Sequence, residues 1–333
     1  MRGIRVAIVG ATGLVGQKIL HVLQERQMPV ASLVPLATES LGRHVVWGGR
    51  HVAIEPLDAM DWDRVDVAFF AASADVSAKH APIATAHGVT VVDKSSYFRM
   101  DAEVPLIVPE VNGDKIGESR LIASPNCSTI QMVVALDPIR RHYGIRRILV
   151  ATYQAVSGTG RDAMTVLENE TRSQSHPQPV NPVYPAPIGF NVLPYCDQFG
   201  DQDYTGEEWK LTRETQKIFG SQIPVTATAV RVPVFVGHSE AVYVETESPW
   251  GSIESLRSLL SHSRSIRVVD DPTKGIVPTP LEAQDRDDVL VGRIRRDPFE
   301  PQGLHLFVVA DNLRKGAATN AVQIIETLSA RFS

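Results

Sequence analysis

The stretch IRVAIVGATGLVG, residues 4–16, decides the fold of this chain. Its first part is a short run of mostly β-branched apolar residues, which is typical of a buried strand. Gly10, Gly13 and Gly16 follow at intervals of three, and a helical pattern of apolar residues begins at about Leu14. This order favours a dinucleotide-binding unit, in which backbone N–H groups and the positive end of a helix meet a phosphate. The spacing is G-x-x-G-x-x-G, so a turn that only eases helix–strand packing is the alternative.

Strand and helix patterns continue to alternate through the first part of the chain. Further strands are predicted over residues 31–38, 65–73, 89–96 and 120–126, with a helix over 77–88. This alternation predicts a Rossmann-type doubly wound parallel sheet with helices on both faces.

The second part of the chain has a different texture. Long alternating segments over residues 146–158, 224–246 and 303–311 predict an α+β domain with a largely antiparallel sheet, covered on one face. The proline-rich section 173–194 is expected to be a surface excursion. We assign residues 1–127 to a dinucleotide-binding domain, completed by a C-terminal helix within 312–333. Residues 128–311 form the catalytic and dimerisation domain.

Composition excludes several classes of protein. The chain has 333 residues, 43% hydrophobic and 21% charged, with a formal net charge of −5. No basic cluster points to a nucleic-acid partner, and no apolar run is long enough to span a membrane. The N-terminus enters a strand pattern almost at once, so we expect no signal peptide. Two cysteines cannot form a disulfide framework and fit a reducing cytoplasm.

Cys127 is the first candidate for chemistry. In LIASPNCSTI, residues 121–130, a strand pattern stops and a helix pattern starts, with Asn126 as a suitable N-cap. The thiol then lies in the first helical turn, where the dipole favours an anion. A buried cysteine is more often a small apolar core residue, and we assign Cys196 to that role.

His238 is the second candidate. Most of the ten histidines have polar neighbours in the sequence, but His238 lies in an apolar strand pattern, RVPVFVGHSE. Period-two alternation sets it on the opposite face from Arg231, and we predict a β-bulge at Gly237 that brings both to one side. A thiolate, a histidine and a nicotinamide cofactor together suggest acyl transfer to sulfur followed by hydride transfer.

Cofactor choice is read at the end of the second strand, in LATESLGR, residues 36–43. Glu39 could hold the 2′-hydroxyl of NAD, whereas Ser40 and Arg43 could hold the 2′-phosphate of NADP. These signals conflict.

Several motifs together resemble bacterial aspartate-semialdehyde dehydrogenase along essentially the whole chain. They are GATGLVG, SPNCSTIQ, TYQAVSGTG, EEWKLTRETQKI, RVPVFVGHSE and ADNLRKGAATNAVQ. The resemblance implies a glyceraldehyde-3-phosphate dehydrogenase-like fold and NADP-dependent reduction of L-aspartyl 4-phosphate to L-aspartate 4-semialdehyde through a thioester. That step leads toward diaminopimelate, lysine, threonine, methionine and isoleucine. It also implies a homodimer or tetramer and no metal.

The same resemblance implies roles for individual residues. Cys127 is the nucleophile, His238 the acid/base, and Gln154 orients the acyl group. Arg231 binds the substrate carboxylate and Glu207 the ammonium. Phosphate is bound by Arg99, Asn126 and Lys210. The expected cofactor contacts are Gly10, Thr12, Gly13, Leu14, Val15, Glu39, Ser40, Ser157, Gly158 and Asn312. From the residues alone, Glu207 and Lys210 are three apart on a helix and would be a solvated ion pair.

One departure and three alternatives remain. Close relatives often have a sequence like LASxRSxGK after the second strand. This chain lacks that arginine, so NAD remains an alternative to NADP as the cofactor. N-acetyl-γ-glutamyl-phosphate reductase shares the chemistry, but the sequence around its cysteine usually resembles NPGCYPT, whereas this chain has PNCST. A catalytically dead paralogue would have lost the cysteine or the histidine, and a short-chain dehydrogenase would need a helical Y-x-x-x-K.

Overall fold

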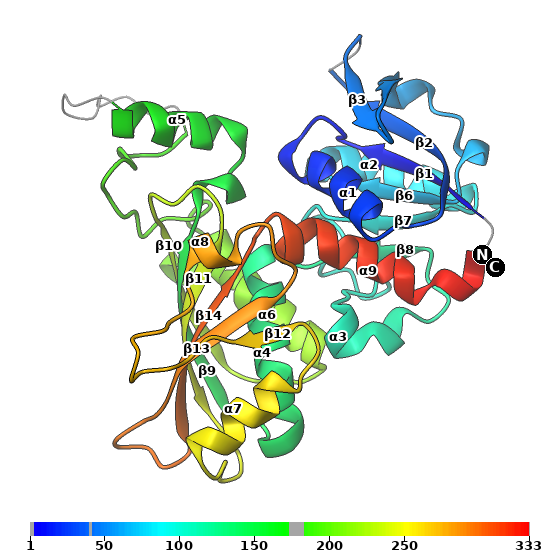
Figure 1. Cartoon of the computed structure of the whole chain (residues 1–333). Helices are drawn as coiled ribbons and strands as arrows, with labels where there is room; N and C mark the ends of the chain where they lie inside the picture. The colour runs from blue at the N-terminus through cyan, green and yellow to red at the C-terminus, as the bar shows by residue number, and fades with distance from the viewer. Residues whose placement is uncertain (1–2, 40–41, 173–182, 333) are drawn as a thin grey trace. The chain divides into compact units, whose positions relative to one another are not determined.

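The computed structural model describes residues 3–39, 42–172 and 183–332. The chain divides into two compact units, which are described separately (Figure 1). The first contains Met1–Asn126 with Ala317–Ser333, and the second contains Cys127–Gly316. Cys127 is therefore the first residue of the second unit.

A six-stranded parallel sheet forms the centre of the first unit, in the order β5-β2-β1-β6-β7-β8. The strands are β1 (Ile4–Val9), β2 (Val30–Ala37), β5 (Glu55–Pro56), β6 (Val67–Phe70), β7 (Thr90–Asp93) and β8 (Leu121–Ala123). The helices are α1 (Leu14–Glu25), α2 (Ala74–Ala86), α3 (Pro109–Asn112) and α9 (Thr319–Thr327). The predicted Rossmann-type sheet is confirmed. The sequence patterns missed the hairpin of β3 (His44–Trp47) and β4 (Arg50–Ala53).

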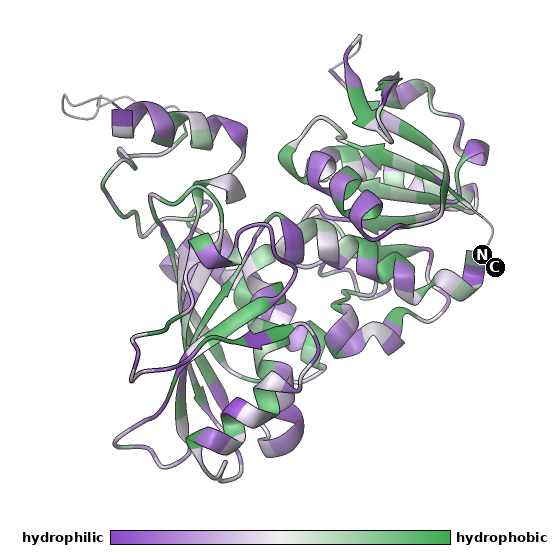
Figure 2. Cartoon of the chain, viewed as in Figure 1, coloured by the Kyte–Doolittle hydropathy of each residue, from purple (hydrophilic) through white to green (hydrophobic). Residues whose placement is uncertain are grey.

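The core of the first unit is built from both ends of the chain. Val6 and Ile8 of β1 are fully buried, and Ile19 of α1 packs into the same cluster. Ile324 and Ile325 of α9 join that cluster, so the C-terminal helix completes the core. Figure 2 shows hydrophobic residues concentrated along the strands.

Close backbone approach explains two glycines of the loop after β1. A Cβ on Gly10, which has φ +80°, would lie 2.4 Å from the carbonyl oxygen of Ala71. A Cβ on Gly16 would lie 2.3 Å from the carbonyl oxygen of Gly10. Both distances are below any van der Waals contact, so only glycine allows this strand–loop–helix geometry.

The second unit contains a mixed six-stranded sheet, in the order β10-β9-β11-β14-β13-β12. Its strands are β9 (Arg147–Gln154), β10 (Val225–Arg231), β11 (His238–Glu245), β12 (Ile266–Val268), β13 (Val289–Arg296) and β14 (Gly303–Ala310). Pairs β9–β11, β11–β14 and β13–β14 are antiparallel, which confirms a largely antiparallel sheet.

Helices cover one face of this sheet. They are α4 (Cys127–Tyr143), α6 (Gly206–Phe219) and α7 (Ile253–Ser261), whereas α5 (Arg161–Arg172) and α8 (Pro280–Ala283) lie beyond the strand ends (Figure 1). Thr205 and Glu208 form a capping box at the start of α6. The predicted excursion 173–194 falls partly outside the described residues. In its described part, Ile188 packs against Leu167 of α5.

The predicted bulge at Gly237 is wrong. Strand β10 ends at Arg231 and β11 begins at His238, with the connection 232–237 between them. Pro233 lies in this connection and has no N–H for a ladder, which explains why one long strand cannot form. Instead, β10 and β11 flank β9, one parallel and one antiparallel, and this pairing sets the ends of β10 and β11 on either side of the end of β9.

The glycine loop yields a stability prediction. We expect Gly16→Ala to lower the free energy of unfolding by about 2 kcal/mol, because the new methyl group overlaps a backbone carbonyl. Gly13→Ala is the matched control, since its Cβ would meet only the carbonyl oxygen of Gly10, at 3.3 Å. It should cost less than about 1 kcal/mol. Urea denaturation followed by circular dichroism measures both; equal destabilisation would contradict the close-approach explanation.

Candidate functional site

Cys127 is the first residue of α4, as the sequence predicted for its position in the first turn. The side chain is half-buried, and the first turn contains no acidic residue. Gly316 lies against it, because a Cβ on Gly316 would be 2.7 Å from the Cβ of Cys127. The thiol therefore stands at the positive end of a helix, and the backbone of Gly316 approaches Cys127 more closely than any residue with a Cβ could. By contrast, burial raises the pKa of the Cys196 thiol to about 12.

His238 is fully buried at the first residue of β11. The backbone N–H of Ala155 donates a hydrogen bond of 3.0 Å to its Nδ1. Nδ1 is thus an acceptor, which assigns the proton of the neutral ring to Nε2. Burial lowers the pKa of His238 well below its usual value, and the nearby charge of Arg231 lowers it further. Nε2 makes no hydrogen bond within the described part of the chain.

The backbone of Ala155 connects the histidine to Arg231. The Arg231 Nη1 donates to the carbonyl oxygen of Ala155 over 2.8 Å, while the N–H of Ala155 holds His238. A Cβ on Gly158 would lie 3.0 Å from both Arg231 Nη1 and His238 Nε2. The guanidinium and the imidazole therefore border the same space beside Gly158, and a side chain at that position would fill it.

A buried acid and an amide extend this site along the end of β9. Gln154 Nε2 donates to Glu207 Oε1 over 3.0 Å. Lys210 Nζ lies 3.5 Å from Glu207 Oε2 and 2.7 Å from Asp197 Oδ2. Only 7% of Glu207 is exposed, so the solvated ion pair read from the residues alone does not describe it.

Ser157 and Asn312 support the turn before the histidine. The Asn312 amide and the Ser157 hydroxyl are hydrogen-bonded at 3.0 Å, and Asn312 Oδ1 accepts the N–H of Gly237 over 2.9 Å. The second unit thus brings the predicted residues of β9, β10 and β11 together, and Gln131 of α4, one turn after Cys127, reaches the carbonyl oxygen of His238. Sequence reasoning missed Ala155, whose contribution is made entirely by its backbone.

The first unit holds the remaining predicted residues. Gly13 precedes α1 with no side-chain cap, so the first N–H groups of the helix, including those of Leu14 and Val15, are available to a phosphate. Together with the close approach at Gly10, this cradle fits a dinucleotide pyrophosphate. Glu39 follows β2 and is exposed, and Ser40 lies outside the described residues.

Arg99 is buried within the same unit, with 8% exposed. Its Nη2 donates to the carbonyl oxygen of Lys94 over 2.8 Å, and Lys94 Nζ in turn donates to the carbonyl oxygen of Pro125 over 3.1 Å. Lys94, which the sequence analysis did not single out, thereby connects Arg99 to the segment that ends at Asn126.

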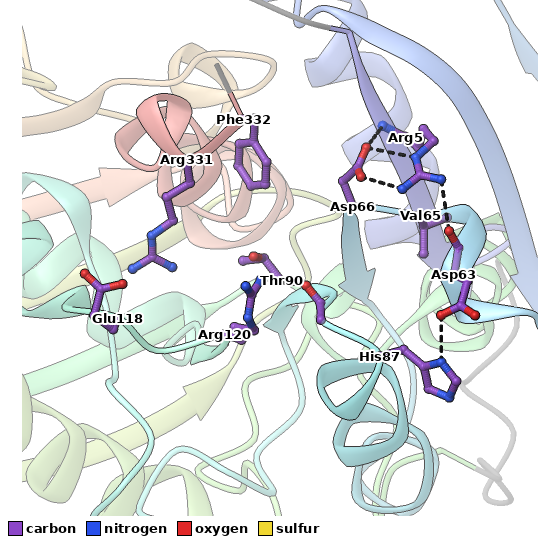
Figure 3. Close-up of a pocket in the computed structure, with 11 residues that line it drawn as sticks. Arg5, Asp63, Val65, Asp66, His87, Thr90, Glu118, Arg120, Arg331 and Phe332 are labelled. Carbon is purple, nitrogen blue, oxygen red and sulfur yellow. Dashed lines mark hydrogen bonds and ion pairs between the residues drawn. The ribbon is translucent and has the colours of Figure 1, made fainter.

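A separate polar cavity of about 490 Å³ opens in the first unit (Figure 3). Its charges are largely satisfied: Arg5 pairs with Asp66 at 2.7 Å, and His87 with Asp63 at 2.9 Å. It lies at the amino ends of the strands, whereas ligands of open α/β sheets bind at the carboxyl ends. We therefore do not assign it to the cofactor.

The described residues contain neither a metal-binding cluster nor a membrane-spanning helix. No group of three or more His, Cys, Asp or Glu side chains among these residues could hold a metal ion. Nor does any described helix combine the length and apolar character that crossing a membrane requires.

Comparison with known proteins covers almost the entire chain. Residues 5–119 match the semialdehyde dehydrogenase NAD binding domain, and residues 136–315 match the semialdehyde dehydrogenase dimerisation domain. An aspartate-semialdehyde dehydrogenase of Shewanella sp. is 47% identical over 330 residues, which are 97% of each chain.

Solved structures agree. Aspartate semialdehyde dehydrogenase II from Vibrio cholerae has a TM-score of 0.96 and 46% identity over 100% of both chains. The same enzyme complexed with ASA gives 0.96 and 45%, again over both full chains. The Candida albicans enzyme with NADP gives 0.77 and 25%, over 98% of this chain and 99% of that one. With a thiol at a helix start, a buried histidine and a glycine cradle in matching order, this chain belongs to the aspartate-semialdehyde dehydrogenase family of oxidoreductases.

Proposed function

We propose that the protein reduces L-aspartyl 4-phosphate to L-aspartate 4-semialdehyde, with release of inorganic phosphate, through an acyl thioester on Cys127. The observation that carries this proposal is the space beside Gly158, bordered by the imidazole and a guanidinium, in the unit that begins with Cys127. The product serves the synthesis of lysine, threonine, methionine and isoleucine. An aldehyde and phosphate would react in reverse, which makes the activity measurable from either side.

The proposed covalent step begins with the sulfur. The Cys127 thiolate attacks the acyl carbon, the C–O bond to phosphate breaks, and phosphate leaves with the electron pair. The loop from Gly10 to Val15 would hold a nicotinamide dinucleotide, whose chemistry would be to supply the hydride for reduction of the thioester. The C–S bond then breaks and returns the electron pair to sulfur. The helix dipole of α4 stabilises negative charge on sulfur at the start and at the end of this cycle.

His238 is proposed as the acid/base. Nε2–H is the group that can meet the reacting atoms, because Nδ1 is held by the N–H of Ala155. In the resting site the ring is neutral, so its Nε2–H first acts as a hydrogen-bond donor to the negative sulfur or to the acyl oxygen. Uptake of a second proton requires the bond to Ala155 to open.

The remaining roles are proposed from the residues that match the family motifs. Arg231 would bind the α-carboxylate in a bidentate manner, and Glu207 the α-ammonium. Gln154, held by Glu207, would orient the acyl group. Arg99, Asn126 and Lys210 are proposed to bind the phosphate. Ser157, Gly158 and Asn312 are proposed contacts of the nicotinamide, and the loop from Gly10 through Thr12 to Val15 holds the pyrophosphate.

We also propose a cytoplasmic homodimer. In the sheet of the second unit, Ala151 and Tyr153 of β9 and Thr226 and Thr228 of β10 point away from the helices and are at least partly exposed. A shallow groove of about 340 Å³ runs over this face. Small, neutral side chains on an open sheet face are suited to packing against a second copy. The match to a dimerisation domain supports the same arrangement.

The nucleophile can be tested directly. We expect Cys127→Ser to bind substrate and cofactor normally and to lower kcat by roughly four orders of magnitude, because a serine hydroxyl is not ionised at neutral pH. Phosphate-dependent oxidation of aspartate semialdehyde, followed by nicotinamide absorbance, measures turnover. Cys196→Ser is the matched control and should retain turnover. Near-normal activity of the Cys127 variant would remove the covalent mechanism.

The histidine gives an independent test. His238→Asn should lower kcat at least about 100-fold, with a KM within a few-fold of the wild-type value, because proton exchange belongs to the transition state rather than to binding. Steady-state kinetics with aspartate semialdehyde measures both constants. A variant in which only KM changes would place the acid/base elsewhere.

Cofactor preference is the third test. We propose NADP, with Arg43 binding the 2′-phosphate in place of the arginine that relatives carry; NAD is the competing cofactor, favoured by Glu39. Arg43→Ala should raise the KM for NADP about tenfold, the loss of one charge-assisted hydrogen bond, and leave the KM for NAD unchanged. A wild-type KM for NAD equal to or below that for NADP would overturn this preference.

A further inference from the structure

Glu240 is a buried acid to which the proposed mechanism gives no role. It follows His238 by two residues on β11, so both side chains lie on the same face of the strand. It is fully buried, and neither carboxyl oxygen has a hydrogen bond of good geometry within the described residues. An ionised carboxylate left unpaired in such a place is far too costly, so its chemistry requires an explanation.

Gln131 is the polar partner within reach of this carboxyl. Its amide is the hydrogen-bonding group that acts on Glu240, and it lowers the pKa of the carboxyl by less than burial raises it. Gln131 lies four residues after Cys127 on α4, one turn along the same helix face. Its Nε2 donates to the carbonyl oxygen of His238 over 3.3 Å, while its Oε1 is buried and has no partner among the described residues. The amide therefore connects the nucleophile's helix to the histidine's strand.

Among the described residues, the groups that act on the Glu240 carboxyl include no positive charge. Thr152 of β9 and Val308 of β14 pair with Glu240 in the sheet, and Gln131 faces it from α4. The titratable neighbours are Glu207 of α6 and His238, which is neutral. Burial raises the pKa of Glu240 well above its usual value, and the charge of Glu207 adds to this rise.

We propose that Glu240 is a positioning residue that remains a neutral carboxylic acid and donates its O–H to Gln131 Oε1. The Gln131 amide is then fixed at both ends, with its Nε2–H on the carbonyl oxygen of His238. These two hydrogen bonds fix the start of α4 relative to the start of β11. They thereby fix the position of Cys127 Sγ relative to the imidazole of His238. The inference deepens the proposed function and depends on it for its kinetic readout.

Kinetics of paired variants test the positioning role. Glu240→Gln keeps a neutral donor of the same shape and should retain kcat within about threefold, whereas Glu240→Met removes the donor and should lower kcat roughly tenfold to 100-fold with KM within about twofold. Gln131→Met should resemble Glu240→Met, and the double variant should be no worse than either single one. A Glu240→Gln variant that loses as much kcat as Glu240→Met, or a folded Glu240→Met variant with normal kcat, overturns the proposal.

Thermal stability tests the protonation state without any activity measurement. An ordinary glutamate ionises near pH 4.5, so above this pH the folded protein must retain a proton that the unfolded chain releases. That cost grows with pH until the raised pKa is reached, and Glu240→Gln does not have it. The Tm of Glu240→Gln should therefore exceed the wild-type Tm by a margin that widens from pH 5 to pH 8.

Glu245→Gln is the matched control on the same strand. Glu245 is partly exposed and pairs with Arg146 at 2.9 Å, so its effect on Tm should not grow over this pH range. A margin for Glu240→Gln that stays constant with pH would overturn the neutral-acid proposal, even in a fully active enzyme. Because this measurement needs only folded protein, its failure is distinguishable from failure of the proposed reaction.

Discussion

The backbone of Ala155 is the constraint on which the site depends. Its N–H engages His238 Nδ1 and its oxygen engages Arg231 Nη1, so two successive peptide groups orient two side chains from the strands that flank β9. Because the histidine is fully buried, the loss of this bond would leave a buried ring nitrogen without a hydrogen bond. The tautomer and the position of the guanidinium are thereby fixed together. A backbone group cannot be altered by an ordinary side-chain substitution, which makes the arrangement resistant to mutation.

Burial sets the chemistry of the residues around that peptide. His238 is held neutral by desolvation and by the charge of Arg231, and the acids Glu207 and Glu240 lie in the same low-dielectric surroundings. A site of this kind strengthens hydrogen bonds to negative charge that develops during reaction, because no water competes for the donors. The side chain of Cys127 at the start of α4 is only half-buried, so substrate can reach the thiol.

The parallel sheet could be predicted from the sequence for two reasons. Strands that are buried on both faces give nearly continuous apolar runs, and close backbone approach requires glycine in the loop after the first strand. The sequence also predicted the position of Cys127, since a helix start is marked locally by the residues around it. The prediction of a bulge between Arg231 and His238 was wrong, because period-two alternation does not reveal whether an apolar run contains one strand or two. Pro233 was the available signal that the strand is interrupted. Ala155 and Gln131 could not be found by residue type, since their importance comes from long-range pairing. The roles assigned to the individual site residues remain predictions.

The return of the last helix to the first unit has a consequence for biosynthesis of the chain. The second unit is one continuous segment, Cys127–Gly316, but the first needs residues from both ends of the chain. During translation, the residues of α9 leave the ribosome after those of the second unit. The apolar side chains against which Ile324 and Ile325 pack stay uncovered until then, so the second unit can fold first and the first unit last.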